Sequence, residues 1–445
     1  MSEPTHSPFS RYQLAELAAP GSDTFVDGPF GSSLKSHEYV DAGVRLIQLQ
    51  NIGEGEWRDE NKKFITPRKF KTLERHGAVP GDIAIAKMAD PVARACLVPP
   101  VSEQFVVVAD CMRLRLDESR FDSGYVVRSI NSPYTRREAE NKAIGSTRVR
   151  INLSVLKTVG CLAPALPEQR EITRILDTLD TAIHETEAII AKLRAVKEGL
   201  LHDLLTRGID DNGELRPPQS EAPHLYKESP LGWIPKTWNV VALGTVLSEP
   251  PRNGLYKPPH LIGRGALLVG QTAFAEEGSV KFEMARRAQV GKADIAGFGL
   301  QACDLLVSRV FATLEGVGRP VIVPDPPEPA VYESNMMRMR AKAGVVTSTM
   351  MFNLLKLPVS RAAVRSRAFL SNQASINRQG ICSIELALPP WDEQVAIDTR
   401  VKALTDRLEH EVEMHSKYRA EKTGLMDDLL TGRVRVTPLL ESAAK

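Results

Sequence analysis

The 445-residue sequence lacks the features that mark membrane, secreted and metal-binding proteins. No stretch approaches the roughly eighteen consecutive apolar residues of a transmembrane helix. The five cysteines are scattered without a C-x-x-C pair, which argues against a zinc site or a disulfide framework. The first residues lack the charged-then-apolar pattern of a signal peptide, and the nine histidines do not cluster. We therefore expect a cytoplasmic protein without a metal site or a membrane partner.

Familiar catalytic motifs are also missing. The sequence contains no G-x-x-x-x-G-K-[ST] phosphate loop, no G-x-G-x-x-G, no H-E-x-x-H and no G-x-S-x-G. Asp325-Pro326-Pro327 resembles the target-base motif of amino-methyltransferases, but Glu328 stands where that motif needs an aromatic ring. A proline-rich turn is the simpler interpretation. The sequence predicts a chain with no catalytic residues and no cofactor of its own.

What the sequence does contain is an internal repeat. Glu168-Gln169 recurs as Glu393-Gln394, an offset of 225 (393 − 168), and "DLLT" recurs at the same offset at residues 203–206 and 428–431. Ile151-Asn152 likewise matches Ile376-Asn377, without a gap. Farther upstream the match loosens: Asp82 would pair with Asp304 at an offset of 222 (304 − 82), and "DGPFG" at Asp27 only faintly resembles "NGLYK" at Asn253. A repeat of this kind indicates two copies of one structural module.

The best-matched segments read as two long helices, residues 166–206 and 389–432. Steps of alternately four and three residues give mostly apolar positions in both, which is the stripe of a coiled-coil seam. The stripe is polar at the same two places in each copy, Thr186/Glu411 and Lys197/Lys422. We expect the two helices, each roughly 60 Å long, to pack antiparallel; the alternative is that each lies on its own domain. The seam residues are Ile172, Leu176, Leu179, Ile183, Ile190, Leu193, Leu200, Ile397, Val401, Leu404, Leu408, Tyr418 and Leu425.

The remaining segments are variable, and short apolar runs bounded by Gly, Pro and Asp predict strands in them. We expect mixed α/β domains at residues 1–165 and 236–388, a Pro- and Gly-rich linker at 207–235 and a tail at 433–445. The predicted fold class is α+β, with two mixed α/β domains separated by two long antiparallel coiled-coil helices in a pseudo-two-fold repeat.

Charge suggests a polyanionic partner for the second variable domain. Residues 230–388 carry 18 Lys and Arg against 11 Asp and Glu, a net charge of +7, whereas residues 1–160 carry 22 against 20, a net charge of +2. Amide and guanidinium groups can read base edges, and basic side chains beside the repeated Ile-Asn turn can hold phosphates. Loop-satisfying hydrogen bonds or a solvated helix face are the alternatives at each position. The candidate DNA-binding residues are Gln48, Gln50, Asn51, Lys87, Arg136, Lys142, Arg148, Arg150, Gln271, Arg309, Arg361, Arg365, Arg367 and Arg378.

Together, the doubled P-x-x-E-Q helix start, "LGWIPKTW" at Leu231 and "DLLTGRVRV" at Asp428 resemble the specificity subunit of type I restriction–modification systems. The resemblance covers essentially the whole chain. It implies two target-recognition domains, each reading half of a bipartite double-stranded DNA site, and a spacer of two paired helices that binds two modification subunits. S-adenosylmethionine would then sit on the modification subunits, and ATP and Mg²⁺ on a restriction subunit that translocates DNA. The start "LPPWDEQ" at Leu388 departs from the usual "LPPLPEQ", and the second helix is more polar, which puts partner affinity at that copy in doubt.

Three other functions fit parts of the sequence. A standalone DNA-binding nuclease would cleave DNA by itself, and a coiled-coil scaffold would show no salt-dependent DNA retention. A specificity-like module of another DNA-modification defence system would differ only in its partner subunits.

Overall fold

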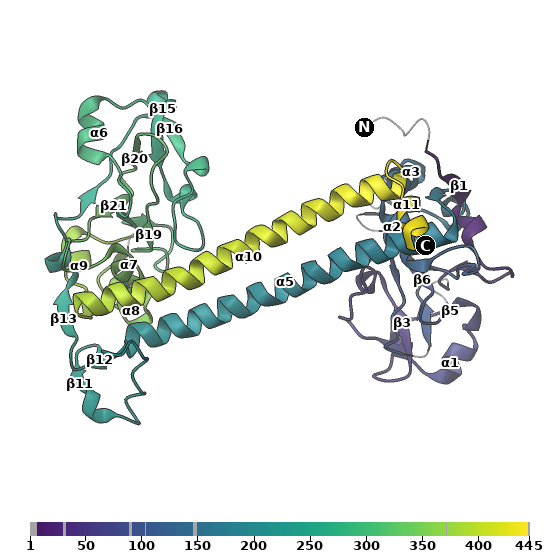
Figure 1. Cartoon of the computed structure of the whole chain (residues 1–445), viewed down its shortest axis with the longest axis horizontal. Coiled ribbons are helices and arrows are strands. Elements are labelled where there is room, and N and C mark those ends of the chain that lie inside the picture. Colours follow the sequence, from purple (N-terminus) through teal and green to yellow (C-terminus); the bar gives the residue numbers. More distant parts are fainter. Residues whose placement is uncertain are drawn as a thin grey trace. The chain divides into compact units, whose positions relative to one another are not determined.

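The computed structural model describes residues 7–29, 33–88, 91–102, 104–145, 149–370 and 372–443. The chain divides into two compact units. Unit 1 comprises Met1–Ile189 and Glu411–Lys445, and unit 2 comprises Ile190–His410. Each unit therefore combines one variable segment with parts of both long helices. Figure 1 labels many of the helices and strands of both units.

Unit 1 contains two four-stranded sheets and a two-stranded ladder. One sheet has the order β2-β9-β6-β7 and is antiparallel throughout, and the other has the order β4-β3-β8-β5, in which β3 and β8 are parallel. The ladder pairs β1 with β10, so the first strand lies beside the strand that leads into the long helix. The strands are β1 Ser10–Gln13, β2 Phe25–Asp27, β3 Val44–Ile47, β4 Phe64–Ile65, β5 Gly77–Ala78, β6 Ile83–Ala86, β7 Ala95–Leu97, β8 Phe105–Val107, β9 Cys111–Leu114 and β10 Gly160–Ala163.

Four short helices follow or interrupt these strands, and side-chain caps fix the start of each. Asp122 accepts a hydrogen bond from the Tyr125 amide at the start of α2, and Asn152 does the same for the Val155 amide at α4. Thr66 caps α1 and Ser132 caps α3, and in both helices a proline follows the cap at the first helical position. The helices are α1 Pro67–Lys71, α2 Ser123–Asn131, α3 Pro133–Lys142 and α4 Leu153–Leu156, and a fifth, α11 Thr437–Ala443, lies in the C-terminal part of the unit.

Unit 2 repeats this plan with additions. Its sheets have the orders β14-β21-β17-β19, β16-β15-β20 and β13-β24, to which it adds the small sheet β18-β23-β22 and the hairpin β11-β12. The strands are β11 Tyr226–Ser229, β12 Gly232–Pro235, β13 Asn239–Ala242, β14 Arg252–Asn253, β15 Ile262–Val269, β16 Arg286–Ala288, β17 Leu305–Ser308, β18 Val310–Phe311, β19 Pro320–Ile322, β20 Ala330–Tyr332, β21 Met336–Met339, β22 Phe369–Leu370, β23 Ala374–Ser375 and β24 Glu385–Leu388. The short helices are α6 Lys292–Phe298, α7 Ser348–Lys356, α8 Pro358–Ser366 and α9 Arg378–Cys382.

Several strands of unit 1 have an equivalent in unit 2. β7, β8, β9 and β10 recur as β19, β20, β21 and β24 at the offset of 225, while β6 recurs as β17 at 222. Asp82 forms a bidentate ion pair with Arg115, and Asp304 forms the same pair with Arg340. The pairing of Asp82 with Asp304 that the sequence suggested is therefore a structural equivalence.

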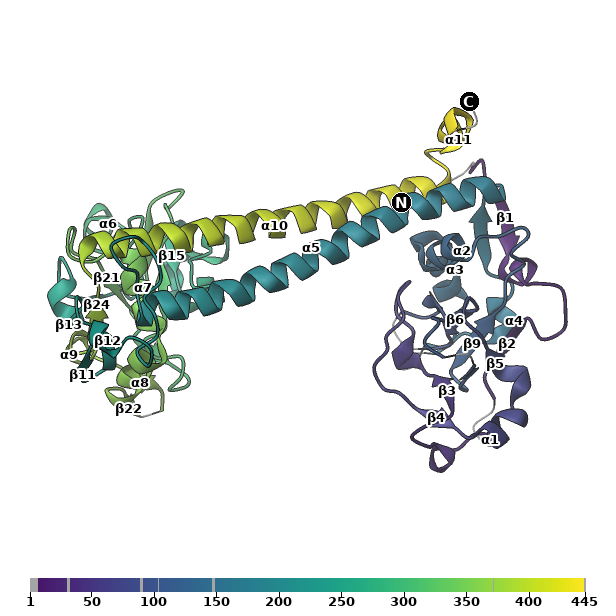
Figure 2. The same ribbon diagram turned by 60° about the horizontal axis from the view of Figure 1, so that its bottom comes forward.

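The long helices are α5, Leu166–Thr206, and α10, Trp391–Thr431, and Figure 2 shows both from a second side. Within unit 1 they run antiparallel, because Asp180 pairs with Lys422 and Glu187 with His415. All the seam positions of both helices are buried or half-buried. None of the helices in the described ranges is long and apolar enough to cross a membrane.

The long helices pack on their own domains in some stretches and on each other in others. Ile172 and Leu176 lie in the same hydrophobic cluster as the strands and helix α2 of unit 1. Ile397 and Val401 likewise join the main core of unit 2. The start of each helix therefore packs on its own domain, whereas the Asp180–Lys422 and Glu187–His415 pairs join helix to helix.

Residues 207–235 are more ordered than the composition of a linker indicated. The β11-β12 hairpin lies here, and Tyr226 donates a hydrogen bond from its hydroxyl to the Pro217 carbonyl at 2.7 Å. Arg216 is buried, and its guanidinium binds Glu393 at the start of α10. The segment is thus a packed connection that holds the second helix.

Candidate nucleic-acid interface

The repeated glutamine at each helix start ties the helix to its own domain. Gln169 accepts a hydrogen bond from the Asp122 amide at 2.9 Å and donates to the Arg120 and Pro164 carbonyls. Gln394 makes the same three bonds, each partner displaced by 225 residues. Its partners are the Thr347 amide and the Val345 and Pro389 carbonyls. The glutamine therefore fixes how each domain is mounted on its helix, and it is not available for chemistry.

A neighbouring pair of side chains keeps its contact in both units but exchanges its identities. In unit 1 the Thr173 hydroxyl donates to Asp122, the residue that caps α2. In unit 2 the Thr347 hydroxyl, which caps α7, donates to Asp398. Residues 122 and 347 are equivalent, as are 173 and 398, so threonine and aspartate have changed places. The hydroxyl–carboxylate bond is kept in both units.

The repeated glutamate clamps the segment that leaves the other helix. Glu168 accepts two hydrogen bonds from Arg435 at 2.7 and 2.8 Å, and this ion pair raises the Arg435 pKa. Glu393 accepts two from Arg216 at 2.5 and 3.1 Å and a third from the Ile209 amide. Each helix start thus holds the chain just after the end of its antiparallel neighbour. Both glutamates are used inside the chain.

Of the amides expected to read bases, only Gln50 is exposed. Asn51 has 0% exposure and donates to the Arg58 and Glu60 carbonyls. It is therefore a structural residue that cannot contact DNA in this conformation, which corrects the sequence-based expectation. Gln48 accepts from Asn61, and the Gln271 amide donates to the Val310 carbonyl.

The candidate cations of unit 1 are neutralised by carboxylates. Arg136 is buried and binds Glu54, Lys142 binds Glu138, Lys87 binds Asp27 and Arg150 binds Asp110. Arg136 is a structural residue because burial and its bonds to Glu54 and Asn131 occupy its guanidinium. Arg148 lies outside the described residues.

The candidate cations of unit 2 have fewer acidic neighbours. Arg361 donates to the Glu315 and Val317 carbonyls and is half-buried, so its role in the fold is mainly structural. Arg367 donates to the Ser383 hydroxyl, and Arg309 to the Ser334 carbonyl. Arg365 and Arg378 are exposed, and neither forms an ion pair within the described part of the chain. They are therefore free to contact phosphate, whereas the exposed Arg150 of unit 1 is held by Asp110.

Several loops meet at one place in unit 2, and we call them the loop cluster. It comprises residues 254–261, 309–311, 333–335, 369–370 and 372–375. The Arg309 amide donates to the Asn335 carbonyl, and the Ile376 amide to the Arg309 carbonyl. Gly254 has no room for a side chain because a Cβ would collide with the Glu333 carbonyl. This close contact between two backbone segments explains why both "NGLYK" and "DGPFG" have glycine at the second position.

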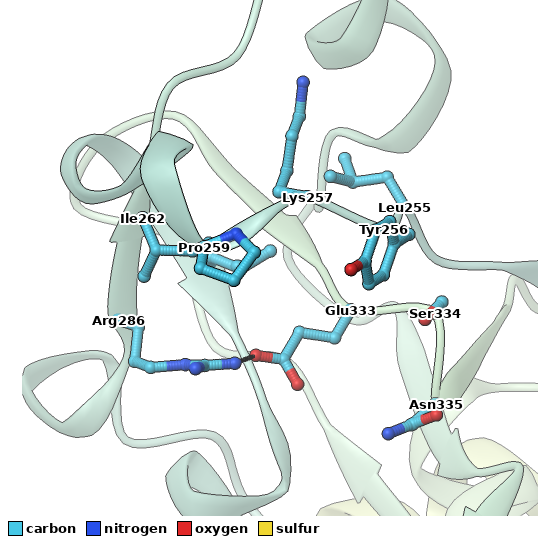
Figure 3. Close-up of a pocket in the computed structure, with 10 residues that line it drawn as sticks. Leu255, Tyr256, Lys257, Pro259, Ile262, Arg286, Glu333, Ser334 and Asn335 are labelled. Atoms are coloured by element: carbon cyan, nitrogen blue, oxygen red, sulfur yellow. Dashed lines mark hydrogen bonds and ion pairs between the residues drawn. The ribbon is translucent and has the colours of Figure 1, made fainter.

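The loop cluster contains a pocket of about 410 Å³. Figure 3 shows Tyr256, Ser334 and Asn335 around it, with the Arg286 guanidinium bound to Glu333. Tyr256 is 74% exposed, and neither Asn335 nor Ser334 uses its side chain in a hydrogen bond among the described residues. An exposed ring beside free amide and hydroxyl groups can stack on a base and bond to its edge. These residues were not predicted from the sequence, although the tyrosine after Asn253-Gly254 was a visible signal.

The loop cluster of unit 1 has the same backbone contacts. The Lys87 amide donates to the Asp110 carbonyl and the Ile151 amide to the Lys87 carbonyl, and Gly28 abuts Val108. A pocket of about 470 Å³ opens here, lined by Met88, Ile144, Arg150 and Asn152. The cluster of unit 1 comprises residues 27–29, 87–88, 108–110, 144–145 and 149–150. Among the described residues, no group of His, Cys, Asp and Glu is placed to hold a metal ion.

Comparison with known proteins shows which proteins the chain resembles. Residues 58–195 match the family model described as "Type I restriction modification DNA specificity domain". The chain is related to the specificity subunits of type I restriction–modification systems. It is 22% identical over 356 residues to the type I restriction enzyme MjaVIII specificity subunit of Methanocaldococcus jannaschii, covering 75% of each chain. It is 23% identical over 426 residues to the EcoKI specificity subunit of Escherichia coli strain K12, covering 89% of this chain and 87% of that one.

Solved structures agree on the fold. The S subunit of a type I restriction–modification system from M. genitalium is 12% identical, with a TM-score of 0.54 over 97% of this chain and 98% of that one. This likeness supports the α+β class and the two long helices. Both curated relatives are named as specificity subunits of type I restriction enzymes.

Proposed function

We propose that the chain reads a bipartite double-stranded DNA site, one half with the loop cluster of each unit, for a type I restriction–modification complex. The observation that carries this proposal is the duplicated scaffold with divergent loops. Backbone contacts of the two clusters recur residue by residue, while their side chains differ: Lys87 corresponds to Arg309, and Asp110 to Asn335. Two equivalent readers with different side chains suit a site whose halves differ in sequence.

The paired helices are proposed to carry two modification subunits, one for each half. Both helices present exposed polar faces along their length, and the fold repeats the helix-start contacts of Gln169 at Gln394. Equivalent surfaces can bind two copies of one partner. In this proposal S-adenosylmethionine is bound by the modification subunits, and ATP and Mg²⁺ by restriction subunits.

Methylation mapping tests the reading function directly. Cells expressing the chain with its modification subunit should acquire adenine methylation at a motif of two short halves separated by an unread spacer. A continuous motif, or no new methylation, would contradict the proposal. Incubation of the purified chain alone with DNA and Mg²⁺ tests the alternative that the chain is a standalone nuclease, because cleavage would show a catalytic site in the chain.

The length of the helices should set the spacer. Deleting the equivalent heptads 186–192 and 411–417 shortens each helix by about 10 Å while keeping the helical phase. Since base pairs rise by about 3.4 Å, the preferred spacer should shorten by about three base pairs. The altered complex should either methylate a motif with that shorter spacer or lose binding. An unchanged spacer would show that the helices do not measure the site.

A further inference from the structure

The most exposed large apolar side chains in the described part of the chain all belong to the two loop clusters. They are Tyr256 and Leu370 at 74% exposure, Ile144 at 73% and Phe369 at 59%, and the next, Met284, is at 54%. Exposed apolar groups gathered in this way mark interaction sites. Their concentration at the proposed reading surface indicates that they contact the ligand of that surface.

Phe369 and Ile144 occupy equivalent positions on a duplicated support. In unit 1, Ile144 and Arg150 exchange both backbone hydrogen bonds, and Arg150 forms a bridge with Met88. In unit 2, β22 pairs with β23, which pairs with β18. In both units the strand that returns from the exposed residues runs beside the segment following Lys87 or Arg309, and it leads into a capped helix. The apolar residues are therefore held by a backbone framework.

The surroundings of the β22 residues are basic in unit 2. Residues 358–378 contain four arginines and no Asp or Glu. Arg365 and Arg378 on either side of β22 are exposed, and Arg367 is held against Ser383. An apolar pair flanked by unneutralised guanidinium groups matches a nucleic acid, whose phosphates need cations and whose stacked bases present apolar faces. Figure 2 shows β22 at the margin of unit 2, next to the end of α8.

We propose that Phe369 and Leu370 insert as a wedge at one base step of the half-site read by unit 2. DNA-bending proteins use Phe, Leu and Ile side chains in this way, so that partial unstacking is offset by the wider contact that a kinked duplex allows. Arg365 and Arg378 hold the phosphates on either side of the opened step. Ile144 is the smaller counterpart in unit 1, and it opens its step less. The wedge rests on the proposed DNA-reading function.

The test uses the full chain assembled with its modification subunit, and duplexes carrying the motif found by methylation mapping. 2-Aminopurine is placed at each step of the unit 2 half-site except the methylated adenine. The wild-type complex should raise the fluorescence at one step. Phe369→Ala with Leu370→Ala should abolish that rise and weaken binding by on the order of tenfold. On a duplex with a mismatch at that step, the loss should shrink to about twofold or less, because the unstacking cost is already met.

Matched variants distinguish a wedge from a general apolar contact and from a protein-docking surface. Met284→Ala removes an exposed apolar side chain of unit 2 outside the loop cluster, and it should leave fluorescence and affinity unchanged. Phe369→Leu with Leu370→Met keeps apolar bulk and should restore most of the signal. A double alanine variant that keeps the fluorescence rise overturns the proposal. If that variant instead loses modification subunit, the residues form a protein-docking surface and the wedge is wrong. A wild-type complex without a bipartite motif refutes the proposed function itself.

Discussion

The two units share a hydrogen-bonding skeleton but differ in how their loop clusters handle charge. In unit 1, Lys87 binds Asp27 and Arg150 binds Asp110, at 2.9 and 2.5 Å. In unit 2 the two carboxylates are replaced by amides, Asn253 and Asn335, and the Arg309 side chain donates to the Ser334 backbone carbonyl instead of a carboxylate. The skeleton mounts each domain on the helices, and the loops are free to change. One scaffold can therefore present two different surfaces to DNA.

The same contrast extends to the helices. Lys422 of unit 1 binds Asp180, whereas its counterpart Lys197 in unit 2 has a pKa lowered by burial, with only Glu409 acting in the opposite sense. Burial also lowers the pKa of Lys356, and the charges of Lys197 and Arg319 lower it further. Lys197, Arg319 and Lys356 thus form a group of neighbouring cations in unit 2, and none of the three has an ion pair among the described residues. This agrees with the higher net charge of its variable segment.

The glutamate clamps offer the largest expected difference between the units. Glu393→Ala leaves Arg216 buried without its carboxylate, which should cost about 3–5 kcal/mol of local stability. Glu168→Ala should cost less, about 1–2 kcal/mol, because the Arg435 side chain is 39% exposed and can turn to solvent. Hydrogen exchange measures the opening free energy of residues 207–216 in one variant and of residues 433–436 in the other.

Two further variants check the cause of that difference. Arg216→Ala and Arg435→Ala remove the cations. If an unpaired buried arginine causes the larger loss of stability in unit 2, the losses for these two variants should differ less than those for Glu393→Ala and Glu168→Ala. Equal losses for Glu393→Ala and Glu168→Ala would show that the clamps are equivalent in energy as well as in geometry.

Exchanging the acidic residues and amides between the two loop clusters should reverse the difference in charge between them. Asn253→Asp with Asn335→Asp places carboxylates near Arg309, and DNA affinity should fall by on the order of tenfold at low salt. Asp27→Asn with Asp110→Asn frees Lys87 and Arg150 and should strengthen non-specific binding. Fluorescence anisotropy across a salt series measures both, and the slope of log K against log salt should become shallower in the first variant and steeper in the second. Identical slopes would mean that these cations do not face phosphate.

The sequence predicted the repeat and the helices well because both depend on local patterns. A 3.5-residue stripe must be buried wherever it lies, and all the predicted seam positions are buried or half-buried in the structure. The match between Asp82 and Asp304 survived a three-residue change of offset because each carboxylate is committed to an arginine, Arg115 or Arg340. The Glu-Gln pair at each helix start could be seen in the sequence, but the residues that it contacts could not be predicted.

The predicted DNA contacts fared differently because residue type does not determine exposure. Asn51 has the chemistry to read adenine, yet it is buried and completes the turn before β4. Arg136 has the charge to hold phosphate, but a carboxylate 82 residues away occupies it. Conversely, Tyr256, Phe369 and Leu370 look like core residues in the sequence, and only the fold leaves them exposed. Long-range pairing decides such cases, and a single sequence does not reveal it.

The exchanged threonine–aspartate pair gives the smallest expected difference between the units. In unit 2, burial raises the pKa of Asp398, and its second carboxylate oxygen is buried without a hydrogen-bond partner among the described residues. Because the folded pKa is raised, the contribution of Asp398 to stability is full below about pH 4 and is lost as pH rises through the raised value. Asp398→Asn keeps an acceptor for the Thr347 hydroxyl and removes the charge.

This variant should therefore be more stable than the wild type at pH 7, by less than about 1 kcal/mol since the site is only partly buried. The gain should vanish below about pH 4, where Asp398 is already neutral. Hydrogen exchange of the amides at the start of α7, compared between wild type and Asp398→Asn from about pH 4 to pH 7, measures this gain in stability. Thr347→Asp with Asp398→Thr is the matched control, because it reproduces the unit 1 arrangement of Asp122 with Thr173 and should keep the bond. If Asp398→Asn were less stable at neutral pH, the ionised carboxylate would be holding the Thr347 cap more strongly than its burial opposes it.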